Sequence, residues 1–215
     1  MSFLIDHIVI AVPDLDRAAW SWTAAGFVVT PRADHPFGTS NRLVVFDSSY
    51  VELVSVTRPA LLPATGFAAD VAGRLTHSGA GITHLALRTE DAVAEAEARA
   101  TAVFEFSRPA PMIDGTTKQA SFSLVVLDGE SRPGLFFCEH HTPEAVWDDA
   151  HTAHANGARR ILAVSLAGPA PDGLDGPEAI SGCRFGAGRN TIETDGGHES
   201  FPVGEVEVRP RRAAF

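Results

Sequence analysis

Several short segments of the chain alternate apolar and polar residues, a pattern typical of β-strands with one buried face. In residues 4–12 this alternation places His7 on the same face as the apolar residues two positions away. Between such segments, apolar residues recur at helical spacing. One predicted helix begins after Asp14, a good N-cap residue, and ends before Gly26, and a second begins after Asp91. The pattern predicts an α+β fold.

The predicted order of strand, helix and three strands occurs twice, and the two copies are similar in sequence. LIDHIVIAVPDLD at 4–16 resembles GITHLALRTEDAV at 81–93, so that 77 residues separate His7 from His84. The later segments GTSN and GTTK keep the same offset of 77 residues. Since an internal repeat indicates architecture more directly than any single element, we expect two equivalent βαβββ modules.

The repeat divides the chain into four parts. We expect a first module at 1–57, a linker with a short helix at 58–80 and a second module at 81–141. Residues 142–215 are predicted to form a helix followed by a degenerate third unit at the C-terminus. In that unit Ala163 falls where the first two copies carry a histidine.

Composition narrows the classes of function. With 215 residues, 45% of them hydrophobic, the chain can bury a core without disulfides. Its net charge of −10 disfavours nucleic acid and anionic membranes as partners, because both require clustered positive charge. Two cysteines, no basic leader and no long apolar run predict a cytoplasmic protein with no membrane association.

Each module places one histidine and one glutamate at matched positions. His7 and Glu52 come from the first copy, and His84 and Glu139 come from the second. Strand alternation directs all four side chains toward the face expected to be buried, where an unpaired carboxylate costs several kcal/mol. Taken singly, a strand histidine is more often a hydrogen-bonded structural residue. The repetition favours one shared polar site.

These features resemble the vicinal oxygen chelate superfamily. The histidines in DHIVIAV and THLAL and the glutamates in YVELVSV and LFFCEHH carry the resemblance. PDLDRAAWSWTAAGFVV and HPFGTSNRLVVF further resemble its glyoxalase-like branch. The resemblance covers residues 4–141 well and the third unit weakly. It implies that the modules pack edge to edge and form a curled mixed sheet, a cup in which His7, Glu52, His84 and Glu139 converge as metal ligands.

The resemblance also implies a function. Four such ligands are typical of glyoxalase-like lyases and isomerases, which act on small molecules with vicinal oxygens and use a divalent metal. Zn, Ni, Mn and Fe all suit this set of side chains. Either Glu139 or Glu52 would move the substrate proton as the catalytic residue. Asn41, Arg42 and His141 are candidate substrate-binding residues near the expected site.

Two other functions stay open at this point. A ring-cleaving dioxygenase with Fe(II) would need only His7, His84 and Glu139. A metal-free binding protein would instead sequester a drug or metabolite in the cup, against aromatic residues such as Trp20, Trp22 or Phe37. The C-terminal unit, which simple two-module enzymes do not need, could cap the cup or form a homodimer contact.

Overall fold

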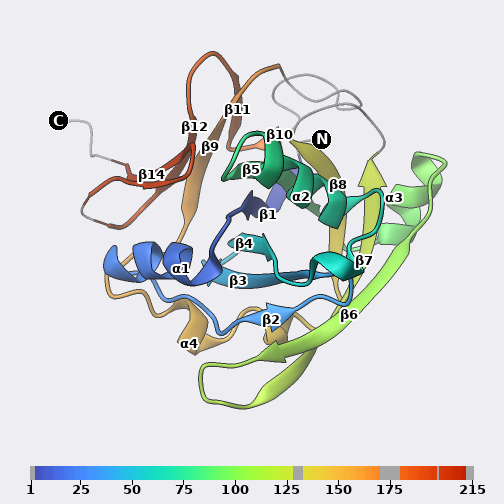
Figure 1. The fold of residues 1–215 in the computed structure, drawn as a ribbon, viewed down its shortest axis with the longest axis horizontal. Coiled ribbons are helices and arrows are strands. Elements are labelled where there is room, and N and C mark those ends of the chain that lie inside the picture. The colour runs from blue at the N-terminus through green and yellow to red at the C-terminus, as the bar shows by residue number, and fades with distance from the viewer. Residues whose placement is uncertain (1–2, 128–132, 170–179, 198, 212–215) are drawn as a thin grey trace.

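The computed structural model describes residues 3–127, 133–169, 180–197 and 199–211. Two β-sheets dominate it, and the helices are few and short (Figure 1). Within these residues no helix is long and apolar enough to span a membrane.

The larger sheet contains both modules. Its strands run in the order β2-β3-β4-β1-β5-β8-β7-β6. In each module the first strand pairs in parallel with the last, and the two first strands pair antiparallel at the centre. The sheet curls until its edges, β2 and β6, contact each other. This confirms the α+β class and the curled mixed sheet. The bounds are β1 (Phe3–Ala11), β2 (Ala33–Asp34), β3 (Thr39–Val45), β4 (Tyr50–Val56), β5 (Gly81–Arg88), β6 (Phe104–Pro111), β7 (Thr117–Leu127) and β8 (Gly134–His140).

Helices α1 (Leu15–Ala24) and α3 (Ala92–Ala98) connect the first strand of each module to the next, and α2 (Phe67–His77) lies between the modules. The predicted N-cap of α1 is confirmed, because the Asp14 side chain accepts hydrogen bonds from two backbone N–H groups of the first turn. Gly26 has φ = 84°, the left-handed conformation that suits glycine after a helix.

The predicted helix after residue 142 is replaced by two short turns. These are the 3-10 turn η2 (Pro143–Ala145) and α4 (Asp149–Thr152). Asp148 is the N-cap of α4, since its side chain accepts the Ala150 N–H at 3.1 Å. Trp147 lies between the two turns and donates its indole N–H to the Phe46 carbonyl at 3.0 Å. This contact anchors the segment to the first module.

The larger sheet has a core on each of its two faces. On the outer face, apolar residues of β1 and β5 pack against α1, α3 and the C-terminal sheet. On the inner face, Val9, Ala11 and Ala86 pack with Phe136 and residues of α2 and η2. The inner face is therefore the inside of the cup, and strand alternation decides which side chains reach it.

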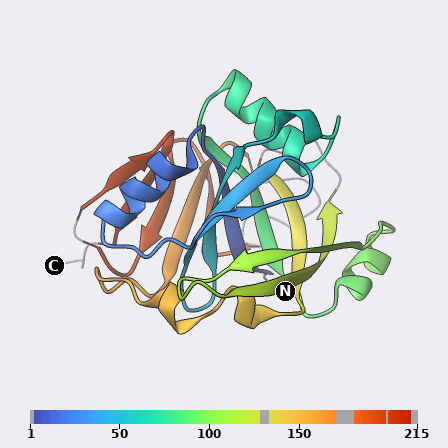
Figure 2. The same cartoon turned by 60° about the horizontal axis from the view of Figure 1, so that its bottom comes forward.

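The C-terminal part forms a separate five-stranded sheet in the order β11-β9-β12-β14-β13. Its two central strands are antiparallel, and each has a parallel neighbour on its other side, which is also the arrangement at the centre of the larger sheet. In Figure 2 this sheet lies beside α1, on the opposite side of the molecule from the β6-β7 hairpin. The bounds are β9 (Ile161–Ala167), β11 (Cys183–Gly186), β12 (Asn190–Thr194), β13 (Phe201–Val203) and β14 (Val206–Pro210), while β10 (Ile180–Ser181) pairs with β1.

The buried residue His154, between α4 and β9, is expected to make the protein less stable in acid. His154 accepts the Val28 N–H at its Nδ1 and packs against Phe27 and Phe46, and burial lowers its pKa below the usual 6.5. The unfolded chain therefore binds a proton more readily than the folded chain, so stability falls as the pH drops below 6.5. Urea unfolding at pH 7.5 and 5.5 measures this effect, and His154→Gln, which keeps an acceptor but does not titrate, should show a smaller decrease. An equal decrease in both proteins would contradict the prediction.

Candidate functional site

The inner face brings together His7 of β1 and Glu52 of β4. Their side chains are nearly inaccessible, with 4% and 7% of the residue surface exposed. His7 Nε2 lies 3.7 Å from Glu52 Oε2, and the His7 ring stacks on the Tyr50 ring at a centroid distance of 4.4 Å. The sequence prediction that these two residues share a site is therefore supported by their position in the cup.

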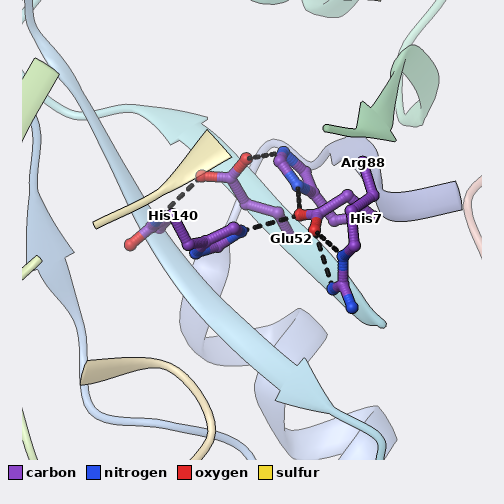
Figure 3. Close-up of polar contacts among 6 residues, drawn as sticks. His7, Glu52, Arg88 and His140 are labelled. Carbon is purple, nitrogen blue, oxygen red and sulfur yellow. Dashed lines mark hydrogen bonds and ion pairs between the residues drawn. The ribbon is translucent and has the colours of Figure 1, made fainter. Parts of the chain in front are cut away.

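A β-bulge adds Asp6 to this pair. The pairing of β1 with β5 shifts register between Ile5 and His7, which leaves Asp6 as an extra residue. A bulge places two consecutive side chains on the same side of a strand, so Asp6 and His7 both reach the inner face. Asp6 Oδ1 then accepts a hydrogen bond of 2.8 Å from His7 Nδ1 (Figure 3).

Asp6 is fully buried and holds a charged network. Its Oδ1 also accepts from His140 Nε2 at 2.9 Å, and its Oδ2 accepts from Arg88 Nε and Nη2 at 2.9 and 2.8 Å. Burial raises the pKa of Asp6, but the hydrogen bonds from His140 and His7 lower it more, and the net pKa lies well below the usual value. Asp6 is thus ionised. Because an ionised carboxylate can only accept, His7 Nδ1 donates in this hydrogen bond, and Nε2 is the ring nitrogen that lies near Glu52.

Glu52 is positioned by residues of the first module alone. Asn41 on β3 donates its amide N–H to Glu52 Oε1 at 2.5 Å, which places this predicted substrate-binding residue inside the site. His35, after β2, brings its Nε2 to 3.7 Å from the same oxygen, and its Nδ1 shares a hydrogen bond with Thr39. Burial lowers the pKa of His35 to about 4, so His35 is neutral at neutral pH.

His84 occupies the position equivalent to His7 but has different partners. Its Nε2 lies 3.4 Å from Asp70 Oδ2 of α2, and its ring packs against Phe67 and Phe136. The ring also covers Gly134, where an added Cβ would lie 2.7 Å from His84 Cδ2. His84 is therefore held toward α2 by its neighbours.

The strand registers identify the residue that corresponds to Glu52 in the second module. Glu52 lies opposite Val9, two positions after His7, whereas Phe136 lies opposite Ala86, two positions after His84. The matching position is thus a phenylalanine. The rings of His7 and His84 both contact Phe136, at centroid distances of 5.4 and 6.0 Å, so the two histidines pack against the same apolar group.

The sequence alignment of Glu139 with Glu52 was therefore wrong by three positions. Glu139 points to the outer face, where its Oε2 accepts the Ala92 N–H at 2.9 Å at the start of α3. Among the described residues, the only three potential ligands with donor atoms within 4.8 Å of one another are Asp6, His7 and Cys138. The expected convergence of His7, Glu52, His84 and Glu139 on one ion is not found.

Two other predicted site residues also lie on the outer face. Arg42 contacts Asp16 of α1 at 2.8 Å, because it alternates with Asn41 along β3. His141 shares a hydrogen bond of 2.6 Å with Ser123, away from the cup. Of the aromatic residues proposed for a binding protein, Trp20 is exposed and Trp22 lies in the outer core.

Comparison with known sequences identifies the class of protein that this fold and site define. Residues 5–176 match the family described as the Glyoxalase-like domain. The chain belongs to this family, and so to the vicinal oxygen chelate superfamily, as the sequence resemblance predicted. No curated protein matches the chain.

Solved structures with a similar fold include one that matches almost the whole chain. A hypothetical protein from Staphylococcus aureus has a TM-score of 0.68 at 13% identity, over 97% of this chain and 100% of that one. Methylmalonyl-CoA epimerase from Mycobacterium tuberculosis has a TM-score of 0.42 at 19% identity, over 63% of this chain and 85% of that one. A variant of the epimerase from Streptomyces coelicolor, in complex with 2-nitronate-propionyl-CoA, has a TM-score of 0.44 at 24% identity, over 63% and 94%.

The residues present fit a divalent ion only in part. His7 suits a metal ligand, because Asp6 holds its Nδ1 and leaves Nε2 available, the usual support for an imidazole ligand. Glu52 supplies a carboxylate oxygen 3.7 Å from that nitrogen. The second module does not complete the site, since Phe136 cannot ligate and His84 faces Asp70. His7 and Glu52 are the two residues that would hold an ion.

Sequence reasoning missed several residues of the site. Asp6 was hidden by the bulge, which breaks the alternation on which the prediction relied. His140 was overlooked because CEHH offers three polar residues in a row, and the register that selects His140 depends on pairing with β7. His35 lies in the connection between the two-residue strand β2 and β3. The residues around it show no periodic alternation of apolar and polar positions.

Proposed function

We propose that this protein is an isomerase- or lyase-type enzyme that moves a proton on a small molecule with adjacent oxygens, and that His7 and Glu52 are its reactive pair. The observation that carries the proposal is the line Asp6–His7–Glu52 within the cup, in which an ionised carboxylate supports the imidazole on one side. Membership of the glyoxalase-like family supports the same class of reaction.

The proposed chemistry is general acid–base catalysis. Glu52, held by the Asn41 amide, accepts the proton that leaves one substrate carbon and returns it to the adjacent carbon. His7 Nε2 takes the proton of the hydroxyl oxygen and gives it to the neighbouring carbonyl oxygen, so that both protons return to the substrate. The Asp6 carboxylate stabilises the imidazolium that forms when His7 takes up a proton, as in other carboxylate–histidine pairs. Such proton transfer contributes about 10²–10⁴-fold to a rate.

A divalent ion would be held by the same two residues, and His7 Nε2 would then be its ligand and would leave proton transfer to Glu52. When bound, it would supply Lewis-acid stabilisation of negative charge on a substrate oxygen. Analysis of the metal content of protein purified without chelators is expected to show that any bound ion depends on His7 and not on His84. His7→Ala should therefore lose the ion and His84→Ala should keep it. Loss of the ion in both variants would contradict this expectation and would mean that His84 is also a ligand.

Three phenylalanine side chains pack around His35, the neighbour of Glu52. Phe37, Phe67 and Phe106 are half-buried, and Phe37 contacts both of the others, with centroid distances of 6.1 Å to Phe67 and 5.6 Å to Phe106. Phe67 of α2 and Phe106 of β6 contact the His35 ring, at centroid distances of 6.2 and 5.7 Å. Apolar side chains packed here limit the access of water to Glu52, which is only 7% exposed.

Hydrogen–deuterium exchange at carbon tests the proposal. Small 2-oxo and 2-hydroxy compounds, both acids and neutral ketones, are incubated with the protein in D₂O and followed by NMR. We expect exchange with at least one compound, and we expect Glu52→Gln to slow it by about 10²–10⁴-fold. Glu139→Gln provides the comparison, because the structure places that carboxylate on the outer face.

The other functions give different results in this assay. Equal exchange rates in the parent protein and Glu52→Gln would contradict the assigned role of Glu52. Binding without exchange for the whole set of compounds would favour the metal-free binding protein. A ring-cleaving dioxygenase would need Glu139 beside His7. Glu139 instead contacts the start of α3 on the outer face, so it no longer supports that function.

A further inference from the structure

The inner face contains a buried cation that lacks a carboxylate partner. Arg108 on β6 is only 5% exposed, yet within the described residues no carboxylate oxygen lies within 4.0 Å of its guanidinium nitrogens. Among the same residues, its side chain makes one hydrogen bond, from Nη1 to the carbonyl of Pro109 at 3.2 Å. Arg88, by contrast, contacts Asp6 through two nitrogens. A guanidinium carries five donors, so most of the capacity of Arg108 is unused.

Burying such a charge is costly. Removing an arginine from water without a paired anion costs several kcal/mol, and arginine does not lose its proton to avoid this cost. Each of the five half-buried arginines among the described residues has an acidic partner. The exposed Arg159 also has one, Asp47, at 3.0 Å. A buried and unpaired arginine is therefore unusual in this protein, and a ligand that supplies the missing anion is a physical explanation for it.

Arg108 lies on the same inner face of the sheet as the proposed reactive pair. Phe106, Arg108 and Ala110 alternate onto the inner face of β6, where their neighbours belong to the inner core. Burial lowers the pKa of Arg108, while the charge of Glu52 opposes that shift, and Arg108 in turn lowers the pKa of His35. The packing agrees with this, because β6 contacts β2, the His35 ring lies 5.7 Å from the Phe106 ring of β6, and His35 Nε2 lies 3.7 Å from Glu52. Glu52 Oε1 is already hydrogen-bonded by the Asn41 amide.

We propose that Arg108 binds the carboxylate of the substrate and that the substrate is a small 2-oxo or 2-hydroxy carboxylic acid. The inference rests on the proposed function. The planar guanidinium matches a carboxylate through two parallel N–H···O bonds, which fixes orientation as well as position. A carboxylate on Arg108 would direct the adjacent oxygen-bearing carbon toward Glu52 and His7. Since Arg108 supplies one positive charge, it suits a monoanion better than a phosphate dianion.

Binding measurements with matched acids and neutral compounds test this assignment. Calorimetry compares 2-oxo and 2-hydroxy acids of three to five carbons with their neutral counterparts, for example pyruvate with hydroxyacetone, and with inorganic phosphate. We expect the parent protein to bind at least one acid about 10-fold or more tightly than its neutral counterpart. Arg108→Met should remove this preference, Arg108→Lys should keep only part of it, and Arg159→Gln should leave it unchanged.

Thermal unfolding separates a ligand-binding role from a structural one. If the role of Arg108 is to bind a ligand, Arg108→Met removes an unpaired buried charge, and we expect it to raise the melting temperature of the ligand-free protein. A lower melting temperature with unchanged acid binding would overturn the proposal. So would a failure of every acid to bind, equal binding of acids and neutral compounds, or tighter binding of phosphate.

The two proposals can fail independently. Acid binding that depends on Arg108, without deuterium exchange in any compound, would leave this inference standing and remove the proposed enzyme activity. Exchange that depends on Glu52 but is equally fast with neutral ketones would keep the activity and remove the carboxylate site. Glu52→Gln should still bind the acid, since it leaves Arg108 in place.

Discussion

Replacing Asp6 with alanine is expected to lower the free energy of unfolding by about 3–5 kcal/mol, the usual cost of removing one partner of a buried charged network. Asp6 is fully buried and accepts hydrogen bonds from His7, His140 and Arg88. The alanine variant would leave the Arg88 charge and two imidazole N–H groups without their acceptor. Urea unfolding at pH 7.5, with equal m-values in both proteins, measures the difference.

The matched control for this experiment is Asp16→Ala. Asp16 also contacts an arginine at 2.8 Å, but its side chain is 83% exposed, so its ion pair with Arg42 is screened by water. We expect a change of no more than about 1 kcal/mol. A cost for Asp6→Ala as small as that of the control would mean that water enters the cup and replaces the lost carboxylate.

The second large effect is expected at Trp22. Trp22→Ala should cost about 3–5 kcal/mol, because the side chain is completely buried and the remaining cavity cannot close. Its ring contacts Phe27 and Phe201, both at centroid distances of 5.0 Å, and so joins α1 to the C-terminal sheet. Denaturant unfolding followed by both tryptophan fluorescence and circular dichroism measures the loss and shows whether the two sheets still unfold together.

Two variants control for the tryptophan result. Trp20 lies on the same helix but is 71% exposed, so Trp20→Ala should change stability by no more than about 0.5 kcal/mol. Trp22→Phe should cost much less than Trp22→Ala, because it keeps an aromatic ring and removes an indole N–H that has no partner within the described residues. Similar costs for Trp20→Ala and Trp22→Ala would contradict the role of Trp22 in joining the sheets.

Much of the fold was predictable because its signals are local. Alternation identified the first strand of each module, Asp14 was confirmed as the cap of α1, and the repeat offset of 77 residues matched His7 with His84. The C-terminal sheet was predicted only as a degenerate unit. Its short strands and glycine-rich connections carry little periodic signal, and its arrangement depends on packing against the outer core.

The candidate site was less predictable, and the reason is strand register. In the first module the prediction for His7, Glu52 and Asn41 agrees with their position on the inner face. In the second module an alignment error of three positions selected Glu139, and an odd error moves a side chain to the opposite face. The residue at the matching position, Phe136, carries no polar atom.

The sequence alone determined that this protein consists of two βαβββ modules, that it belongs to the glyoxalase-like class and that its first module presents a histidine and a carboxylate on one face. Periodicity and internal similarity are sufficient for the modules and the shared face, because they depend only on neighbours along the chain, whereas the class follows from the resemblance of its motifs to a known family. Only the tertiary structure decided that Asp6 and His140 join His7, that His35 contacts Glu52 and that Arg108 lies on the same inner face. Those contacts depend on a bulge and on pairing between distant strands, and neither leaves a pattern in the order of the residues.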